Sequence, residues 1–434
     1  MTISSSLSAS VAGLNANATR LASIADNIAN AGTFGYKRVV TEFSNMVTAG
    51  NRGAGTYSAG GVRAGTVRLV EERGDLIGTS KALDLAIAGR GMLPVMQEVE
   101  LNSGGGGSLY MTRTGSFSLD ANGVLKTDSG LVLMGWPADA NGVIPPFPRD
   151  TLAGLQPIVI NANQAVSNPT TQIGFGVNLP ATMTVAGSTA TPPPLSVEYF
   201  DNLGISRTLE MTFVPQVPAT GSSNQWQMQM RDSASGNALV GEFTLTFDAT
   251  RGGGGALLSV VPISGGTYDP ITGDLNVNVA GGPMSVGIGR LGDTDGMTQL
   301  SDTFLPVAVT KNGSPVGTLT NVEVDKDGYV NATYDTGFTR RLYQIPLVDV
   351  PNPNGLSAFS NQTYQASSDS GSFFLWDAGS GPTGSIEGYS REGSKTDVAA
   401  ELTALIQTQR AYSSNAKVIQ TVDEMLQETT NIKR

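Results

Sequence analysis

Residues 4–38 read SSSLSASVAGLNANATRLASIADNIANAGTFGYKR, and an apolar side chain recurs in them every seven positions. Such a heptad pattern is typical of an amphipathic helix that packs on another helix. We therefore predict a helix from about Ser5 to Asn30, which the glycines at 32 and 35 end. The predicted seam of this helix consists of Leu7, Val11, Leu14, Leu21 and Ile28.

A second heptad pattern lies at the other end of the chain, in SKTDVAAELTALIQTQRAYSSNAKVIQTVDEMLQETTNIKR (394–434). It predicts a long helix that opens with a capping pair, Ser394 and Asp397. The predicted seam of this helix consists of Val398, Leu402, Leu405, Tyr412, Ile419 and Leu426.

Each predicted helix needs a partner, because an isolated helix is marginally stable in water. One arrangement is a self-contained hairpin of the two helices. However, Ile24 and Ile406 widen the apolar stripes beyond a two-helix seam. The same helices of neighbouring molecules could cover this surplus, and periodicity alone leaves the two arrangements open.

Between the helices the sequence indicates β structure. Strict alternation in TLEMTF, WQMQM, FTLTF and LNVNV places apolar residues on one face and Thr, Gln or Asn on the other. Asn-Gly and Asp-Gly pairs mark hairpin turns. The predicted class is mainly β, with two or more antiparallel β domains on a coiled-coil pair of terminal helices.

Three parts of the chain are expected from these patterns. Residues 1–70 and 385–434 would form the terminal helices and extended arms, including the Gly-rich segment 47–61. Residues 71–147 and 298–384 would form an inner β domain. The alternating segment 148–297 would be an inserted outer β domain.

Composition narrows the possible functions. The net charge of −11 argues against non-specific binding to nucleic acid or to an anionic membrane. The chain has no cysteine and no histidine, which excludes disulfides, Cys/His zinc sites and His-based triads. No secretory signal or membrane-spanning segment is evident.

Motifs that could indicate chemistry have simpler interpretations. GIGRLG (287–292) precedes DTDGMT, which cannot open the helix that a phosphate-binding loop requires. EVDKDGYV (323–330) lacks the bidentate Glu of a calcium loop and reads as a hairpin. Paired carboxylates such as Glu71 and Glu72 suit exposed turns. We therefore predict no catalytic, metal or cofactor site and no enzymatic activity.

Both ends resemble a known family. LNANATRLASIADNIANAGTFGYKR is similar to the N-terminal signature of the bacterial flagellar rod, hook and hook-associated axial proteins. DVAAELTALIQTQRAYSSNAKVIQTVDEMLQETTNI is similar to their C-terminal signature, and GYVNATYDTGFTRRLYQIPLVDVPNPNGL resembles hook proteins specifically. The motif residues that carry the resemblance are Asn27, Asn30, Gly35, Gln409, Arg410 and Asp423.

The resemblance implies a structural subunit that assembles helically into the flagellar hook, the universal joint between rod and filament. It implies an inner coiled-coil layer of terminal helices around a channel, an extracellular location, and export without a cleaved signal peptide. Expected partners are copies of the same chain, rod, hook-cap and hook–filament junction proteins, and the flagellar export apparatus. We expect the terminal helices to be largely disordered before assembly, because each lacks its neighbours.

Two alternatives remain. A distal rod protein would share both terminal signatures, although such proteins are shorter and lack an insert like 148–297. A secreted carbohydrate-binding or hydrolytic β protein would need converging carboxylates and aromatic side chains. Trp226 lies in an alternating strand, where burial in the core is the simpler expectation.

Overall fold

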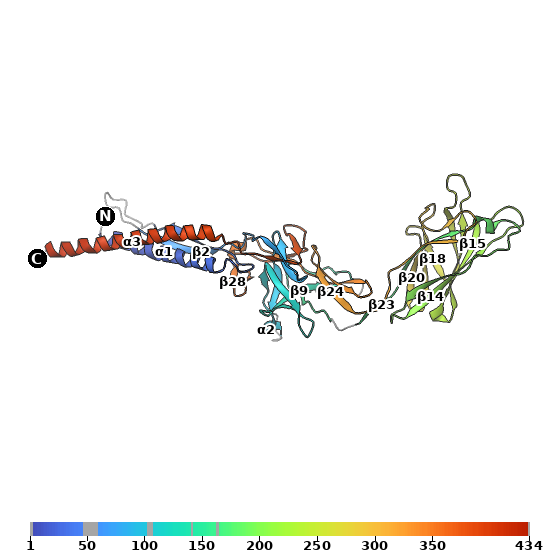
Figure 1. The fold of residues 1–434 in the computed structure, drawn as a ribbon, viewed down its shortest axis with the longest axis horizontal. Coiled ribbons are helices and arrows are strands. Elements are labelled where there is room, and N and C mark those ends of the chain that lie inside the picture. Colours follow the sequence, from blue (N-terminus) through green and yellow to red (C-terminus); the bar gives the residue numbers. More distant parts are fainter. Residues whose placement is uncertain (1–2, 47–59, 102–106, 140–141, 162–164, 433–434) are drawn as a thin grey trace. The chain divides into compact units, whose positions relative to one another are not determined.

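The computed structural model describes residues 3–46, 60–101, 107–139, 142–161 and 165–432 (Figure 1). Within them the chain is mainly β, with α1 (Ile3–Ala29) and α3 (Val398–Ile432) near its two ends and a short α2 (Glu98–Leu101). The predicted β class and both terminal helices are confirmed. The chain divides into unit 1 (Met1–Ala162, Asn321–Ala332 and Thr339–Arg434) and unit 2 (Asn163–Thr320 and Thr333–Phe338).

Local chemistry sets the helix bounds. The chain turns away after α1 through Gly35, whose φ is +72°, in the left-handed region that favours glycine. A Cβ there would lie 2.8 Å from Cγ2 of Thr114. At the start of α3, the Asp397 carboxylate accepts hydrogen bonds from the backbone N–H groups of Ala399 (2.9 Å) and Ala400 (3.2 Å). Asp397 is therefore the N-cap, and Ser394 only accepts a hydrogen bond from the N–H of Thr396.

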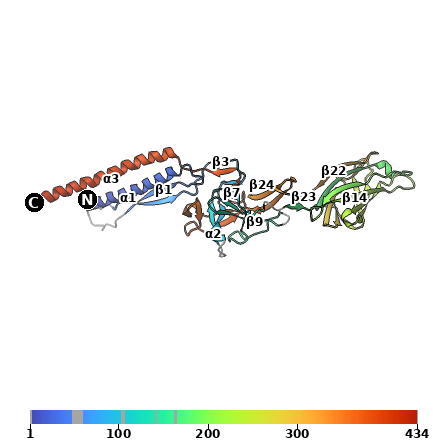
Figure 2. The same ribbon diagram turned by 60° about the horizontal axis from the view of Figure 1, so that its bottom comes forward.

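A two-stranded antiparallel ribbon follows α1. It consists of β1 (Val39–Asn45) and β2 (Val62–Arg68), and its register runs from Val39↔Arg68 to Asn45↔Val62. The ribbon lies along α1 in both views (Figures 1 and 2). Most of the segment predicted as an extended arm, 47–59, lies outside the described residues.

The β part of unit 1 is built around one large sheet, whose strand order is β28-β29-β6-β5-β9-β8-β7-β4-β31. Strands β10 and β26 also pair with β9, and β24, β25 and β26 form a meander. Smaller pairs are β3–β32 and β27–β30. The elements of this part are β3 (Leu76–Gly78), β4 (Asp84–Ala88), β5 (Leu93–Gln97), β6 (Tyr110–Thr112), β7 (Thr114–Leu119), β8 (Leu125–Thr127), β9 (Leu131–Pro137), β10 (Gln156–Pro157), β24 (Leu319–Val324), β25 (Tyr329–Tyr334), β26 (Thr339–Gln344), β27 (Leu347–Asp349), the 3-10 helix η3 (Pro353–Gly355), β28 (Ser357–Phe359), β29 (Thr363–Gln365), β30 (Phe374–Trp376), β31 (Ser385–Glu387) and β32 (Ser390–Glu392).

Unit 2 contains two sheets. The first has the order β13-β14-β15-β16-β17, and the second has the order β18-β19-β20-β12-β21 with β22 also paired to β12. A separate pair joins β11 to β23. The elements are β11 (Val166–Asn168), β12 (Gln172–Leu179), η1 (Ala181–Thr184), β13 (Leu195–Phe200), β14 (Ser206–Pro215), β15 (Gln225–Asp232), η2 (Ser233–Ser235), β16 (Ala238–Phe247), β17 (Leu257–Ser264), β18 (Gly266–Asp269), β19 (Asp274–Val279), β20 (Gly282–Gly287), β21 (Thr298–Gln299), β22 (Leu305–Lys311) and β23 (Ser314–Gly317).

The core of unit 2 comes from the alternating strands. Trp226, Met228 and Met230 on β15 are fully buried, and they share one apolar cluster with residues of the second sheet such as Phe175 and Leu275. The Gln side chains between them on β15 are at least partly exposed. The predicted in–out alternation is thus confirmed, and Trp226 belongs to the core.

Unit 2 differs at both ends from the segment expected as the insert, 148–297. Strand β10 pairs with β9 and so stays in unit 1, whereas β22 lies beyond 297 and pairs with β12 of unit 2. The alternating stretches mark the core strands well, but an edge strand such as β22 has every residue exposed and so lacks that signal.

The core of unit 2 gives a first prediction. Met228→Ala should destabilise unit 2 by about 2–5 kcal/mol, because it leaves a cavity in a fully buried site. Leu258→Ala on β17, where the side chain is 55% exposed, should change the stability by less than about 0.5 kcal/mol. Urea unfolding measured by the fluorescence of Trp226, in a Trp136→Phe and Trp376→Phe background, reads this unit alone. Equal losses for both variants would contradict this assignment of the core.

Candidate self-assembly interface

The terminal helices lie side by side and run antiparallel (Figure 2). At one end, Nδ2 of Asn27 on α1 donates a hydrogen bond of 3.1 Å to Oε1 of Glu401 on α3. Further along, Gly13 faces Asn415, and a Cβ on Gly13 would lie 2.9 Å from Nδ2 of Asn415. A glycine is therefore what allows the two helices to approach at this point.

The surfaces buried on the two helices are rich in small and polar residues. On α3 the buried positions Glu401, Thr408 and Val422 fall on one heptad face, with half-buried Asn415 between them. The buried residues of α1 are Ser10, Ala16, Asn17, Ser23, Ile24 and Asn27. The buried positions of α3 also recur every seven residues, but each lies three residues after a predicted seam residue. The seam residues concerned are Val398, Leu405, Tyr412 and Ile419.

The predicted seam residues are only partly covered within the chain. On α1, Leu7, Leu14, Leu21 and Ile28 are half-buried and Val11 is exposed. On α3, Leu405 and Ile419 are half-buried. Four seam residues of α3 are exposed by two fifths or more of their surface, as is Ile406 beside them: Val398, Leu402, Ile406, Tyr412 and Leu426. We name these five residues the α3 stripe.

The side-chain amide of Asn27 donates two hydrogen bonds and accepts two. Its Nδ2 donates to the Val39 carbonyl (2.8 Å) and to Glu401, while its Oδ1 accepts from the N–H of Val39 (2.8 Å) and from the Tyr36 hydroxyl (3.1 Å). All four hydrogen-bonding positions of a buried side chain are thereby satisfied. Asn27 joins α1, the ribbon and α3, which gives this motif residue a structural role.

The other motif residues divide into two groups. Asn30 donates to the carbonyl and carboxylate of Asp26 (both 2.9 Å) at the end of α1, and Gly35 is buried at the turn described above. Gln409, Arg410 and Asp423 are exposed on α3, and of these Asp423 accepts a hydrogen bond from Gln427 one turn further on. None of these three forms a hydrogen bond or ion pair with the described part of α1 that would explain its place in the motif.

Glu401 is a buried carboxylate in the first turn of α3. Its Oε1 accepts from Nε of Arg38 at 2.5 Å as well as from Asn27. The Glu401 side chain is 2% exposed, and Arg38 is about one third exposed. This contact fixes the first turn of α3 to the segment that leaves α1.

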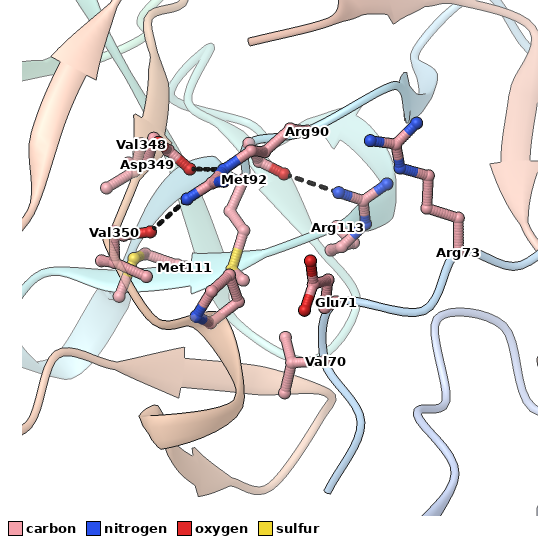
Figure 3. Close-up of a pocket in the computed structure, with 12 residues that line it drawn as sticks. Val70, Glu71, Arg73, Arg90, Met92, Met111, Arg113, Val348, Asp349 and Val350 are labelled. Atoms are coloured by element: carbon pink, nitrogen blue, oxygen red, sulfur yellow. Dashed lines mark hydrogen bonds and ion pairs between the residues drawn. The ribbon is translucent and has the colours of Figure 1, made fainter. Parts of the chain in front are cut away.

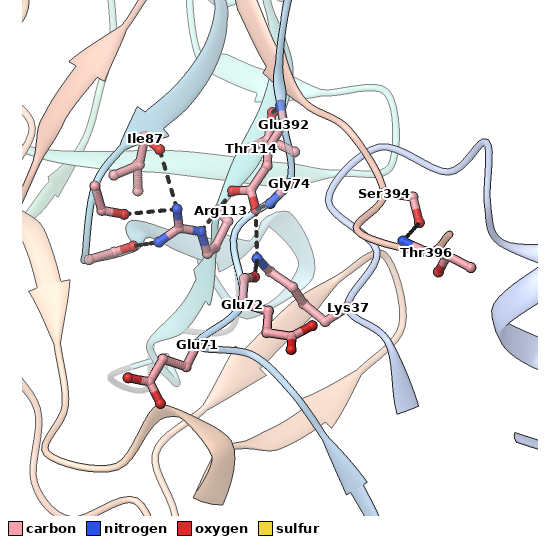
Figure 4. Close-up of polar contacts among 12 residues, drawn as sticks. Lys37, Glu71, Glu72, Gly74, Ile87, Arg113, Thr114, Glu392, Ser394 and Thr396 are labelled. Atoms are coloured by element: carbon pink, nitrogen blue, oxygen red, sulfur yellow. Dashed lines mark hydrogen bonds and ion pairs between the residues drawn. The ribbon is translucent and has the colours of Figure 1, made fainter. Parts of the chain in front are cut away.

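A second buried carboxylate, Glu392, lies at the end of β32, just before the segment that leads into α3 (Figure 4). Its Oε1 accepts from Nζ of Lys37 (2.6 Å) and from the N–H of Gly74 (2.8 Å), and its Oε2 accepts from Nε of Arg113 (2.7 Å). Lys37 also donates to the carbonyl of Glu72. The side chains of Lys37, Arg113 and Glu392 are at most 5% exposed, and we name these three residues the Glu392 cluster.

Backbone contacts complete the Glu392 cluster. The guanidinium of Arg113 donates to the carbonyls of Gly91 (2.9 Å), Gly89 (2.9 Å) and Ile87 (3.2 Å). The Glu392 N–H donates to the Thr114 hydroxyl at 3.1 Å. Buried charges are tolerated when they are paired and their hydrogen bonds are satisfied, as they are here.

Burial and pairing shift the pKa values in this cluster. Burial lowers the pKa of Lys37 to about 8, although Glu392 opposes the shift. Burial alone would raise the pKa of Glu392, but Arg113 and Lys37 outweigh it and hold that pKa below its usual range. The Glu392 carboxylate is therefore the charge that the two neighbouring cations stabilise.

Next to this cluster is a cavity of about 140 Å³ (Figure 3). Met92, Met111 and the Arg113 guanidinium line it, together with Arg90, which donates to Asp349 (2.6 Å) and to the Val350 carbonyl (2.7 Å). Both arginines are thus committed to partners within the chain. Across the described ranges, no three metal-ligating side chains gather into a site.

Sequence reasoning missed the Glu392 cluster. Lys37 lies in the quoted GYKR segment, but nothing there indicates that it is buried. Its partner Glu392 is 355 positions away along the chain.

No helix in the part of the chain that the structure describes has the length and apolar character needed to cross a bilayer.

Three family profiles match the chain. The profile described as Flagella basal body rod protein matches residues 7–37. The profile of the Flagellar basal body protein FlaE D2 domain matches 177–314, and that of the Flagellar basal body rod FlgEFG protein C-terminal matches 386–432. The matches thus cover most of α1, all of α3 and most of unit 2.

Relatives are similar over the whole length. The flagellar hook protein FlgE of Brucella suis biovar 1 is 34% identical over 432 residues, which cover 98% of both chains. That of Rhizobium meliloti is 33% identical over 444 residues and 100% of both chains. The crystal structure of the Helicobacter pylori flagellar hook protein FlgE2 aligns with 72% of this chain and 99% of its own, with a TM-score of 0.46 and 12% identity.

The Glu392 cluster leads to a stability prediction. Glu392→Gln should destabilise unit 1 by about 3–5 kcal/mol, because it leaves Lys37 and Arg113 buried without their counter-charge. Glu98→Gln, also in unit 1, removes a similarly short ion pair (2.7 Å to Lys126) whose carboxylate is 44% exposed, so its effect on stability should be much smaller. Urea unfolding in a Trp226→Phe background reads unit 1 through Trp136 and Trp376. Similar effects of the two variants would show that the cluster is not the tie described here.

The same cluster predicts how stability depends on pH. Because the pKa of Glu392 is lowered from 4.5 in the folded chain, its contribution is present above pH 4.5 and is lost as the pH falls through the folded value. For Lys37, the unfolded chain binds more protons between pH 8 and 10.5, so its effect on stability rises with pH there. Unfolding free energies of unit 1 measured across both windows should show the acid loss in the wild type and a smaller loss in Glu392→Gln. An identical acid profile would assign the loss to other carboxylates.

Proposed function

The chain belongs to the family of flagellar hook proteins, and we propose that it assembles through its terminal helices into the helical tube of the hook, the flexible joint between rod and filament. In this proposal α1 and α3 form a coiled-coil inner layer of the tube. Its seam consists of the residues predicted from the heptads, and neighbouring copies complete it.

The α3 stripe is the observation that carries this proposal. Within one chain, the contact between α1 and α3 uses Glu401, Thr408 and Val422, which leaves Leu402 and Ile406 47% and 51% exposed. A self-contained hairpin would bury its apolar seam, whereas here Glu401 and Thr408 are buried and the α3 stripe stays exposed. Helices of neighbouring copies would remove this apolar surface from water.

The fold also supports a division of labour within the subunit. Residues 1–70 and 385–434 would form the polymer core, the rest of unit 1 an inner β part, and unit 2 an outer domain. Within one subunit, force between the polymer core and the β part would pass through the segment that follows α1 and the segment that precedes α3. The Glu392 cluster and the Glu401 contact hold these two segments, and so they would transmit part of that force.

Family membership supports the remaining parts of the proposal. These are contacts with rod, hook-cap and hook–filament junction proteins, and export through the flagellar apparatus without a cleaved signal peptide. A carbohydrate-binding or hydrolytic protein would need an accessible aromatic side chain at its binding site. Trp226, the aromatic residue considered for that role, is fully buried in the unit 2 core.

Assembly gives the test of this proposal. Wild-type protein moved from dilute solution into ammonium sulfate, which strengthens apolar burial, should gain helical circular dichroism and form tubes seen by electron microscopy. Leu402→Ser with Ile406→Ser should stay monomeric, because the α3 stripe no longer offers apolar surface. Gln407→Ala changes an exposed residue on the same turn and should assemble normally.

Two results would count against the proposal. Tubes formed by the double-serine variant at wild-type concentrations would show that the α3 stripe is not the contact surface. A wild-type protein that stays monomeric with its helices fully formed under every condition would favour the self-contained hairpin.

A further inference from the structure

Because this chain contains no cysteine, methionine is its main target for mild oxidants. Nine of the methionines that the structure describes are buried: Met92, Met96, Met111, Met134, Met211, Met228, Met230, Met284 and Met297. Met183 packs partly buried against the unit 2 core. Met46 and Met425 differ from all of these, since each is 52% exposed.

Met425 lies in an apolar patch near the end of α3. Residues 418, 422, 425 and 426 share one helix face by their spacing. Val422 is buried, whereas Val418, Met425 and Leu426 are 44%, 52% and 41% exposed. We name these four residues the C-terminal patch.

The helix register explains this exposure. Asn27 is opposite Glu401 and Gly13 is opposite Asn415, so the same antiparallel register places Ile3, the first described residue of α1, opposite Met425. Beyond that point α3 continues to Ile432 without a described part of α1 beside it. The C-terminal patch therefore lies where the described helix pair stops covering α3.

We propose that Met425 is an oxidation site of the unassembled subunit, and that its conversion to the sulfoxide blocks assembly. The oxidant is hydrogen peroxide. The thioether sulfur attacks one peroxide oxygen, the O–O bond breaks, and the departing hydroxide takes the proton of the transferred oxygen. The sulfur is thereby oxidised by two electrons to the sulfoxide, and the peroxide is reduced to water. This proposal rests on the proposed function, because it requires the end of α3 to be a contact surface.

The consequence follows from the position of Met425. An exposed methionine contributes little to the fold, so the oxidised subunit keeps its structure. Once a neighbouring copy covers the patch, however, a sulfoxide places a polar group in an apolar contact. In the assembled tube the same contact shields Met425 from peroxide, so the site is open to oxidation only before assembly.

Peptide mass spectrometry on full-length protein separates the two exposed sites. Tryptic peptides 39–52 and 418–433 each contain a single methionine, Met46 and Met425. Peroxide should oxidise both in the monomer faster than the buried methionines. After assembly, oxidation of Met425 should slow on the order of tenfold, in line with its removal from solvent.

Assembly of pre-oxidised protein tests the blocking effect. The concentration needed for tube formation in ammonium sulfate should rise on the order of tenfold in oxidised wild type and in Met46→Leu. Met425→Leu keeps the size and apolar character of the side chain, so it should assemble normally before and after peroxide. Methionine sulfoxide reductase should restore the oxidised wild type.

The outcomes are distinguishable. If oxidised Met425→Leu is blocked as strongly as the wild type, or if wild type carrying the Met425 sulfoxide assembles normally, this inference is overturned while the proposed function stands. If no protein assembles even without peroxide, the proposed function itself fails.

Discussion

The carboxylate of Glu392, which precedes α3, forms ion pairs with both Lys37 and Arg113. Lys37 lies in the segment after α1, and Arg113 lies between β6 and β7 of the large sheet. Three distant parts of the chain therefore meet at one buried charge. Such a contact has little tolerance for a missing partner, because each remaining ion would stay buried without compensation. The position of both helices relative to the β part of unit 1 depends on it, together with the Glu401 contact.

The two terminal helices bury polar residues against each other and leave several large apolar residues exposed. Their mutual contact is partly polar, with Gly13 against Asn415 and Asn27 bonded to Glu401. Hydrogen bonds of this kind specify register more than they add stability. The larger apolar side chains instead remain at the edges or on the outside, where they can contribute to association. In the proposed assembly, one chain would set the geometry of the pair and neighbouring chains would supply much of the burial.

The sequence predicts the elements of this fold better than their partners. Heptads identify α1 and α3 to within a few residues, and alternation identifies the core side chains of unit 2, because both signals are local. Which heptad face lies against the other helix is not a local property, and Thr408 would not be chosen over Leu405 from the pattern alone. The pairing of Glu392 with Lys37 and Arg113 is still harder to predict, since no spacing rule links residues this far apart.

Charge distribution completes the argument for association through the helices. The chain carries a net charge of −11, yet Arg20 and Asp26 are the only charged residues of α1. Asp26 shares the hydroxyl hydrogen of Tyr36 with Asn27, so part of this small charge is already engaged within the chain. Many copies of α1 can therefore approach one another with little like-charge repulsion, while the acidic residues elsewhere keep the free subunit soluble. In the proposed assembly, copies of α1 would therefore associate through apolar contact with little electrostatic penalty.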